Sequence, residues 1–486
     1  MIDTLDATII YIDFFIYFVA MFLLGCYALT RTQGNEGFIL GGRSVGPYTS
    51  AISAGASDMS SWLILGLPGA VYGSGLVEGL WISLGLVIGA YLNWHLIAAK
   101  LRRFSEILNA ITIPSYLQNR FNAQGTLLKT LATVVILMFF TLYVASGLKG
   151  GSLLFSYVFD SSALTGLIIT TVVVVSYTFL GGYLAVCWTD LIQGLLMLAA
   201  LVFLTLFGHY ALFASNIDIA QVKPEAFKVA TTWITGASLM AWGLGYFGQP
   251  HILARFMGIR SSKDVPVARR IAIIWMIVCL LLSTAIGMIG IGYGEISSLP
   301  GVNGLGGDKE RIFLVLTYTL FHPFFAGLIL AAVLAALMST ADSQLLVLSS
   351  SLTEDLPFFS KMEDSLKIWI SRGGVVVFAI IALLIAVNDT GSILSMVSYA
   401  WGGFGAAFGP LMILSVCWRG TTQAGAIAGM VSGAASIIIF KNFVSIEGEY
   451  LYELLPSFFI SMLAIILVSS MTSKPDEETL GKLELD

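Results

Sequence analysis

Long apolar segments separated by short polar loops dominate the chain. Runs of about 18 or more mainly apolar residues recur along nearly its whole length, each long enough to cross the roughly 30 Å core of a bilayer as a helix. This pattern predicts an all-α polytopic membrane protein with about thirteen transmembrane helices. The predicted segments are residues 8–30, 44–73, 77–100, 126–155, 162–181, 184–212, 233–254, 270–294, 325–350, 368–388, 391–418, 421–441 and 453–472.

One carboxylate lies in the middle of the second segment. The stretch SAGASDMSSW, from Ser53 to Trp62, surrounds Asp58 with alanine, glycine and serine. A charge at the centre of a spanning helix costs at least about 2.5–3.5 kcal/mol and usually marks an ion or substrate pathway. We therefore expect a functional role for Asp58, with capping of a broken helix as a structural alternative that does not exclude it.

Two further stretches interrupt apolar segments. Residues 338–344 read MSTADSQ, and residues 242–250 read WGLGYFGQP. The first is rich in hydroxyl and polar groups, and the second contains Gly and Pro, which break helices. Together with the stretch around Asp58, these predict three interrupted helices that share one site.

Basic residues are concentrated in alternate loops. Five of them lie between residues 255 and 270, for example, and the loops on the opposite side contain few. By the positive-inside rule, the basic side is cytoplasmic. This places the N-terminus outside and the C-terminus inside the cell, which requires an odd number of spans.

We predict a single transmembrane domain over residues 1–474, followed by a charged, disordered cytoplasmic tail at 475–486. Within the domain, residues 8–30 form an extra N-terminal helix and residues 421–472 form two C-terminal helices. Residues 44–212 and 233–418 form two five-helix blocks, each opened by an interrupted helix. Because five is odd, the blocks have inverted topology, which is typical of transporters that bind their substrate near the midplane.

Three connecting segments have predicted roles of their own. Residues 101–125 are polar and indicate an interfacial helix on the cytoplasmic face. Residues 300–309 form a glycine-rich external loop, and residues 311–321 a short surface helix.

Composition excludes a soluble globular protein. Hydrophobic residues make up 57% of the chain and charged residues 11%, with a mean hydropathy of +0.90. The four cysteines lie in or beside apolar segments without a CxxC pair, so we expect free thiols. The four histidines are scattered without metal-binding spacing, and no transition-metal site is expected.

Neutral oxygen ligands suit a sodium ion. Ser339 and Thr340 provide two hydroxyls, and Ala336, one helical turn before Thr340, presents its carbonyl on the same face. By spacing alone, ordinary helix packing is the simpler interpretation of the two hydroxyls. Asp342, two residues beyond Thr340, and Asp190, expected near the membrane interface, are further carboxylates that a second cation would use.

Aromatic side chains provide a candidate surface for a partly apolar solute. Trp242 and Tyr246 are four residues apart and share a helix face, and the neighbouring glycines give a carboxylate access to backbone N–H groups. An aromatic core or interfacial belt is the alternative. Tyr143, in FFTLYVASG, is a candidate of the same kind.

Four motifs resemble the sodium/solute symporter family. They are GGRSVGP at residues 41–47, SAGASDMSSWLILGLPGAV from Ser53, GLGYFGQPHILARFM at 243–257 and SYAWGGFGAAFGP at 398–410. The resemblance covers essentially the whole chain and is specific to the proline-transporting branch. The sequence departs from that branch at Ser61, where the branch has glycine. This change lies next to the expected site and bears on the affinity for the solute or on which solute is accepted.

The resemblance implies inverted repeats with a leucine-transporter-like core and the import of L-proline coupled to Na⁺. It implies sodium ligands from the carbonyls of Ala56 and Met59 and from Ala336, Ser339 and Thr340. It assigns sodium coupling to Asp58, Ser60 and Arg43. It assigns substrate binding to Trp62, Tyr143, Trp242, Tyr246 and Pro250.

The expected partners are L-proline, a sodium ion and the lipid bilayer of the bacterial cytoplasmic membrane, with no nucleic acid and with a monomer as the functional unit. Alternatives within transport are another small amino or organic acid, or proton coupling through Asp58. A substrate-gated channel or sensor is a further alternative, and an intramembrane enzyme has no support because no nucleophile–base motif is present.

Overall fold

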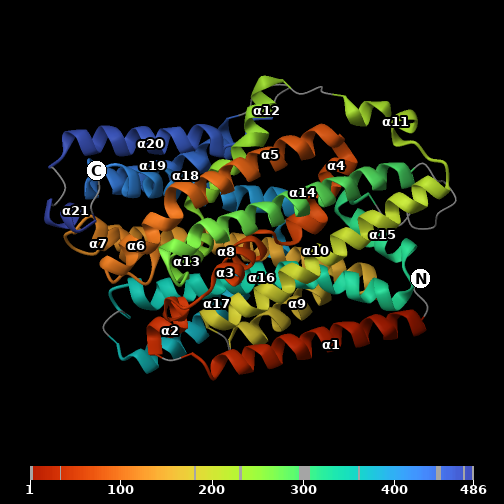
Figure 1. Ribbon diagram of the computed structural model, residues 1–486, viewed down its shortest axis with the longest axis horizontal. Helices are drawn as coiled ribbons and strands as arrows, with labels where there is room; N and C mark the ends of the chain where they lie inside the picture. The colour runs from red at the N-terminus through yellow and green to blue at the C-terminus, as the bar shows by residue number, and fades with distance from the viewer. Residues whose placement is uncertain are drawn as a thin grey trace.

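The computed structural model describes residues 4–32, 34–179, 182–228, 232–294, 307–359, 362–444, 450–473 and 477–483. Within these ranges the regular structure is helical, apart from one isolated β-bridge between Val45 and Ile259 (Figure 1). The predicted all-α fold is confirmed. The two marked chain ends lie at opposite ends of the molecule's long axis.

Ten helical stretches of the described chain are long and apolar enough to cross a membrane. They are α1 (Thr4–Leu29), α5 through α6 (Leu76–Ile107), α8 (Leu127–Phe159), α10 (Tyr183–Ala214), α14 (Val265–Gly294) with the turn before it, α16 (Pro323–Asp355), α17 (Asp364–Asn388), α18 (Ile393–Cys417), α19 (Gln423–Phe443) and α20 (Leu454–Met471).

The other three predicted segments are shorter or interrupted. They correspond to α3, η2 and α4 (Pro47–Asp58, Trp62–Gly66, Leu67–Ser74), to α9 (Ala163–Thr178), and to α12, η5 and α13 (Trp233–Met240, Ala241–Gly248, Pro250–Gly258). The count of thirteen spans therefore stays a prediction. The short elements are α2 (Gly34–Leu40), η1 (Gly41–Arg43), η3 (Trp94–Ala98), α7 (Ile113–Arg120), α11 (Ile219–Val222), η4 (Pro224–Phe227), η6 (Ser262–Asp264), η8 (Lys309–Arg311), α15 (Ile312–Leu320) and α21 (Glu477–Leu483).

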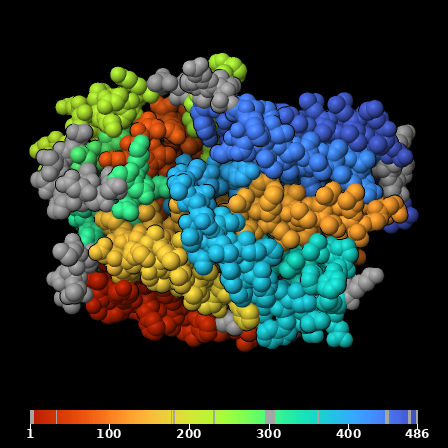
Figure 2. Space-filling view, turned by 180° about the vertical axis from the view of Figure 1, so that it is seen from behind, coloured from red at the N-terminus to blue at the C-terminus, as the bar shows by residue number. Residues whose placement is uncertain are grey.

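The molecule has an enclosed centre and a lipid-facing periphery. In the most apolar stretch of α16 and of α18, 83% of residues are buried, against 33% in α1, α17 and α20. Figure 1 shows α3 and α16 in the middle, with α1 and α20 along opposite edges. On the reverse face, Figure 2 shows the red N-terminal and the blue C-terminal segments along opposite edges as well. The interrupted helix thus lies where protein, not lipid, surrounds its unpaired backbone groups.

The predicted break in the second segment is confirmed. Helix α3 ends at Asp58, and Met59 leaves the helical region with a ψ of 77°. The chain resumes with a wide π-helical turn at residues 62–66 and continues into α4. The small residues allow close packing here: a Cβ on Gly55 would lie 2.7 Å from the ring of Trp275.

The second interruption, in WGLGYFGQP, is also confirmed. Residues 241–248 form a 3₁₀ stretch between α12 and α13. Its glycines are required because the backbone touches its neighbours: a Cβ on Gly243 would lie 2.0 Å from the carbonyl oxygen of Gly85 in α5, and one on Gly248 2.2 Å from that of Phe404 in α18.

The third predicted interruption is wrong. Helix α16 runs without a break from Pro323 to Asp355, through MSTADSQ. No Gly or Pro occurs after Gly327 in this helix, and the hydroxyls of Ser339 and Thr340 hydrogen-bond to the carbonyl of Ala336 in the preceding turn. Polar side chains that bond to their own helix do not need to break it.

Two predictions about connecting segments are also corrected. Residues 477–483 of the tail form α21, in which Leu480 and Leu483 are buried and Arg103 of α6 donates to the carbonyl of Leu483 at 2.6 Å. Helix α15 is packed rather than superficial, because residues 312–317 are all buried. The predicted interfacial segment 101–125 contains the end of α6 and all of α7. Most of the glycine-rich loop at 300–309 lies outside the described residues.

Candidate sodium and substrate site

Four of the five expected sodium ligands meet where α3 crosses α16. The hydroxyl oxygen of Ser339 lies 2.8 Å from the carbonyl oxygen of Ala56 and 3.1 Å from that of Ala336, and Thr340 Oγ1 lies 3.2 Å from the latter. All four residues are buried. Met59, the fifth, is fully buried just beyond the end of α3. The arrangement gathers uncharged oxygens from two helices, a donor set that suits a hard cation.

Asp58 is the last residue of α3 and is fully buried. Its Oδ2 accepts a short hydrogen bond from the hydroxyl of Tyr246, and its backbone carbonyl accepts from Trp62 Nε1 at 2.9 Å and from the hydroxyl of Tyr143 at 3.3 Å. Asp58 therefore joins the break in α3 to three of the expected aromatic residues. This combines both roles considered from the sequence, since the residue ends the helix and contacts the aromatic cluster.

The aromatic cluster lies beside the break. The ring centroids of Trp62 and Trp242 are 6.3 Å apart, and those of Trp242 and Tyr452 are 5.3 Å apart. The ring of Tyr246 meets Trp401 edge-on at 5.0 Å. Apolar faces with hydroxyl and indole N–H groups at their edges suit a small solute that has both a ring and a charged end.

Sequence reasoning missed three residues of this cluster. Trp401 Nε1 donates to the carbonyl of Trp242 at 2.8 Å, and Asn93 Nδ2 donates to that of Tyr246 at 2.9 Å. Tyr452 packs on Trp242 and donates to the carbonyl of Ser398 at 2.8 Å. Trp401 belongs to the glycine-rich motif at residues 398–410, which could have marked it as a site residue. Asn93 and Tyr452 have no distinctive sequence context.

Three other predicted residues lie at different positions. Ser60 is buried at the break, where its hydroxyl accepts from Trp62 N at 3.4 Å. Ser61 is fully buried against α8: a Cβ on Gly150 would lie 2.6 Å from that of Ser61. Pro250 begins α13 and lines a small separate cavity together with Ala254, rather than the aromatic cluster.

Arg43 lies outside the sodium site and fastens η1 to α6 and α13. Its guanidinium donates to Ser105 Oγ at 3.0 Å, to the carbonyls of Met257 at 3.0 Å and Ala110 at 2.8 Å, and is 3.3 Å from a carboxylate oxygen of Glu36. Burial, followed by repulsion from Arg102, lowers the pKa of Arg43. An effect of Arg43 on coupling would therefore act through the positions of these helices.

Asp190, expected from the sequence near the membrane interface, is enclosed by protein. It is fully buried in α10, where its Oδ2 lies 3.1 Å from Arg255 Nη2 and accepts from Ser53 Oγ at 2.6 Å. The same guanidinium group makes a short hydrogen bond to Ser343 of α16. Because Arg255 already supplies the opposite charge, Asp190 is a poor candidate for a second cation ligand. Asp342 is also fully buried.

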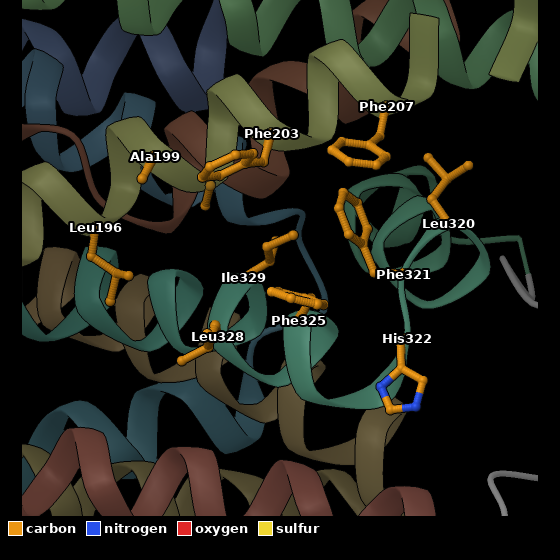
Figure 3. A pocket seen from close by; sticks show the side chains of 11 residues that line it. Leu196, Ala199, Phe203, Phe207, Leu320, Phe321, His322, Phe325, Leu328 and Ile329 are labelled. Atoms are coloured by element: carbon orange, nitrogen blue, oxygen red, sulfur yellow. The ribbon is translucent and has the colours of Figure 1, made fainter. Parts of the chain in front are cut away.

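An apolar cavity of about 420 Å³ lies elsewhere, between α10 and the α15–α16 junction (Figure 3). Phenylalanine side chains from both elements line it, with His322 at one edge. Several of these side chains, including Phe203 and Phe325, are about half exposed. It contains none of the predicted site residues and lies at the outer surface of the helix bundle.

The interrupted helices, the buried carboxylate and the oxygen cluster are features typical of a membrane transporter. The family model for the sodium:solute symporter family matches residues 38–433. A sodium/proline symporter of Staphylococcus aureus strain bovine RF122 / ET3-1 is 44% identical over 96% of this chain and 93% of its own length, and that of strain JH9 is 43% identical over the same shares.

Solved structures share the fold. A Na⁺-coupled sialic acid symporter in an outward-open state aligns with a TM-score of 0.79 at 20% identity, over 96% of this chain and 99% of its own. Mhp1, a nucleobase-cation-symport-1 family transporter, aligns at 0.59 and 15% identity over 93% and 98%. The chain belongs to the sodium:solute symporter family, and it is a transporter that spans the membrane several times.

Proposed function

We propose that this protein imports L-proline into the bacterial cell together with Na⁺. The hydrogen bond from Ser339 of α16 to the carbonyl of Ala56 in α3 is the observation that carries the proposal. It marks a point where an interrupted helix and a continuous helix present oxygens to each other in the protein interior. The high identity to sodium/proline symporters over nearly the full chain supports proline as the solute.

In this mechanism Na⁺ binds between the carbonyls of Ala56, Met59 and Ala336 and the hydroxyls of Ser339 and Thr340. It fixes the break in α3 and so orients Asp58, whose carbonyl and carboxylate hold Trp62, Tyr143 and Tyr246. Proline then binds with its ring against the aromatic cluster. By linkage, Na⁺ and proline raise each other's affinity by the same factor.

The two predicted repeats, residues 44–212 and 233–418, would then rock against each other and open the inner side. The N-terminus lies outside and the C-terminus in the cytoplasm, as the basic loops indicate. One positive charge entering at about −100 mV contributes about 2.3 kcal/mol to accumulation.

Uptake of labelled L-proline into right-side-out membrane vesicles tests the proposal, with inward gradients of Na⁺, K⁺ or H⁺ compared. Accumulation should require Na⁺, collapse in Asp58→Asn, and need about tenfold more Na⁺ in Ser339→Ala, a loss of about 1.4 kcal/mol. Ser349→Ala is the matched control, because that buried hydroxyl bonds to the carbonyl of Leu346 in its own helix. A folded native chain that accumulates no proline with Na⁺ would refute the substrate or the ion.

A further inference from the structure

A small cavity lies beside the last turns of α16, away from the aromatic cluster. Its volume is about 20 Å³, and the segment before α7, together with α2, α13 and α16, encloses it. A space of this size holds about one water-sized particle. Most of its lining is apolar, but three hydroxyl residues face it, namely Thr112, Ser350 and Ser351.

Buried oxygens at this place lack hydrogen-bond partners. Among the described residues, Ser350 Oγ, Ser351 Oγ and Asp355 Oδ2 have none, although the three residues are only 2%, 1% and 1% exposed. Such groups are normally satisfied by a partner, a water molecule or an ion. Asp355 follows Ser351 by one helical turn and is joined to the cavity by Thr112, whose hydroxyl donates to Asp355 Oδ1 at 2.8 Å.

The electrostatics at this end of α16 favour a cation. Asp355 is the last residue of a 33-residue helix, where the helix dipole is negative. Lys129 already responds to this field: its ammonium lies 3.2 Å from Asp355 Oδ1 and donates to the carbonyl of Glu354 at 2.9 Å. Asp355 Oδ2 remains available on the other side of the carboxylate.

The cavity and the sodium site lie along one face of α16. Thr340, Ser343, Val347, Ser351 and Asp355 follow at intervals of three or four residues, which keeps them on the same side of a helix. Thr340 and Ser351 are eleven residues apart, or roughly 16 Å along the axis. Leu346 and Val347, which also line the cavity, lie between these two residues along the helix.

We propose that Ser350, Ser351, Thr112 and Asp355 form a transit site for Na⁺ on its way from the main site to the cytoplasm. Hydroxyl and carboxylate oxygens are the ligands that hard cations prefer. When the ion leaves, Lys129 remains paired with the carboxylate of Asp355, so release of Na⁺ does not leave that buried negative charge without a positive partner. The inference rests on the proposed Na⁺-coupled function and adds the route of release.

The test compares the two faces of the membrane. Right-side-out vesicles give the half-saturating Na⁺ concentration for proline transport from the outer face, and inside-out vesicles give it from the inner face. In the Ser350→Ala/Ser351→Ala double variant and in Asp355→Asn, the inner value should rise by about tenfold, equivalent to about 1.4 kcal/mol, while the outer value stays within about twofold. Ser349→Ala, whose hydroxyl lies outside the cavity, should change neither value.

An unchanged inner value in the serine double variant would overturn the proposal, as would equal changes at both faces. This variant keeps the test decisive if Asp355→Asn fails to fold, because it preserves the bonds from Thr112 and Lys129. A native chain that moves no proline with Na⁺ would refute the proposed function separately. In that case, binding of ²²Na⁺ to the purified protein tests the transit site without transport. Adding Ser350→Ala and Ser351→Ala to Thr340→Ala should abolish the Na⁺ binding that remains in the Thr340→Ala protein. Undiminished binding would overturn the transit site.

Discussion

At the scale of single residues, the contact between Asp58 and Tyr246 connects the proposed ion site to the aromatic cluster. Tyr246→Phe keeps the ring against Trp401 and removes the hydroxyl that donates to the carboxylate. A hydrogen bond to a charged group contributes about 1.5–3 kcal/mol, so we expect at least about a tenfold loss in proline affinity or Na⁺ affinity. Uptake kinetics in vesicles measure both values.

Tyr48→Phe is the control for this change, because Tyr48 is 68% exposed at the start of α3. Normal kinetics in Tyr246→Phe would show that the hydroxyl does not contribute to coupling. The same result in Asp58→Asn would remove the carboxylate from the mechanism altogether.

The sequence was informative where one residue conflicts with its surroundings. A carboxylate among small residues in an apolar segment is costly wherever the segment folds, so Asp58 stood out without a structure. Trp401 and Tyr452 did not stand out as site residues, because aromatic side chains are common in membrane helices. Their role depends on contacts with Trp242 across 159 and 210 residues of chain, and such pairing cannot be read from local pattern.

At the scale of helices, the sequence correctly predicted the breaks after Asp58 and at residues 241–248, where the backbone itself leaves the α-helical path. It wrongly predicted a break in α16 from polar side chains alone. The glycines around Tyr246 and the turn after Asp58 interrupt their helices as predicted. The hydroxyls of α16 do not, because a serine or threonine can bond to its own preceding turn. A polar stretch within an apolar segment therefore indicates a site but does not by itself indicate an unwound helix.

The contact between η5 and α5 gives a prediction about stability. A Cβ on Gly243 would meet the backbone of Gly85 at 2.0 Å, and backbone atoms move less easily than flexible side chains. Gly243→Ala should destabilise the protein by about 1–3 kcal/mol, the usual cost of overpacking. Thermal unfolding in detergent measures the change.

Gly373→Ala provides the opposite expectation as a control. No atom lies within 4 Å of a Cβ at Gly373 in α17, so alanine should raise stability by up to about 1 kcal/mol through helix propensity. Equal unfolding temperatures for the two variants would show that the η5–α5 contact is looser than described.

A carboxylate outside the spans caps α18. Glu310 of η8 accepts hydrogen bonds from the backbone N–H groups of Ile393 at 3.0 Å and Leu394 at 3.1 Å. Burial raises the pKa of Glu310 above the ordinary 4.5, although the two N–H groups act in the opposite direction. The folded protein thus holds a proton on Glu310 more tightly than the unfolded chain does.

The sign of the pH effect follows from this difference. The contribution of Glu310 to stability is fully present below pH 4.5 and is lost as pH rises through the higher pKa of the folded state. Relative to Glu310→Gln, the native chain should therefore lose unfolding free energy across that interval. Unfolding in detergent at a series of pH values tests this, and parallel curves for the two proteins would contradict it.

At the scale of the whole molecule, the buried pair of Arg255 and Asp190 holds together four helices of the transport core. Arg255 belongs to α13 and contacts Asp190 of α10, Ser53 of α3 and Ser343 of α16. Both charged side chains are fully buried. One guanidinium group thus links helices from four separate parts of the chain, directly beside the proposed path of Na⁺.

A double-mutant cycle measures this link. Removing one partner of a buried pair leaves an unpaired charge and costs about 3–5 kcal/mol, so Arg255→Met and Asp190→Asn should each destabilise the protein strongly. The double variant should lose much less than the sum of the two, because no bare charge remains.

The partly exposed pair of Arg260 and Asp264, 3.0 Å apart, is the matched comparison and should show a coupling of at most about 1 kcal/mol. Additive effects at Arg255 and Asp190 would mean that each acts on its own. Asp190 would then again be available as a ligand for a second cation, and transport in Arg255→Met should show a changed ratio of Na⁺ to proline.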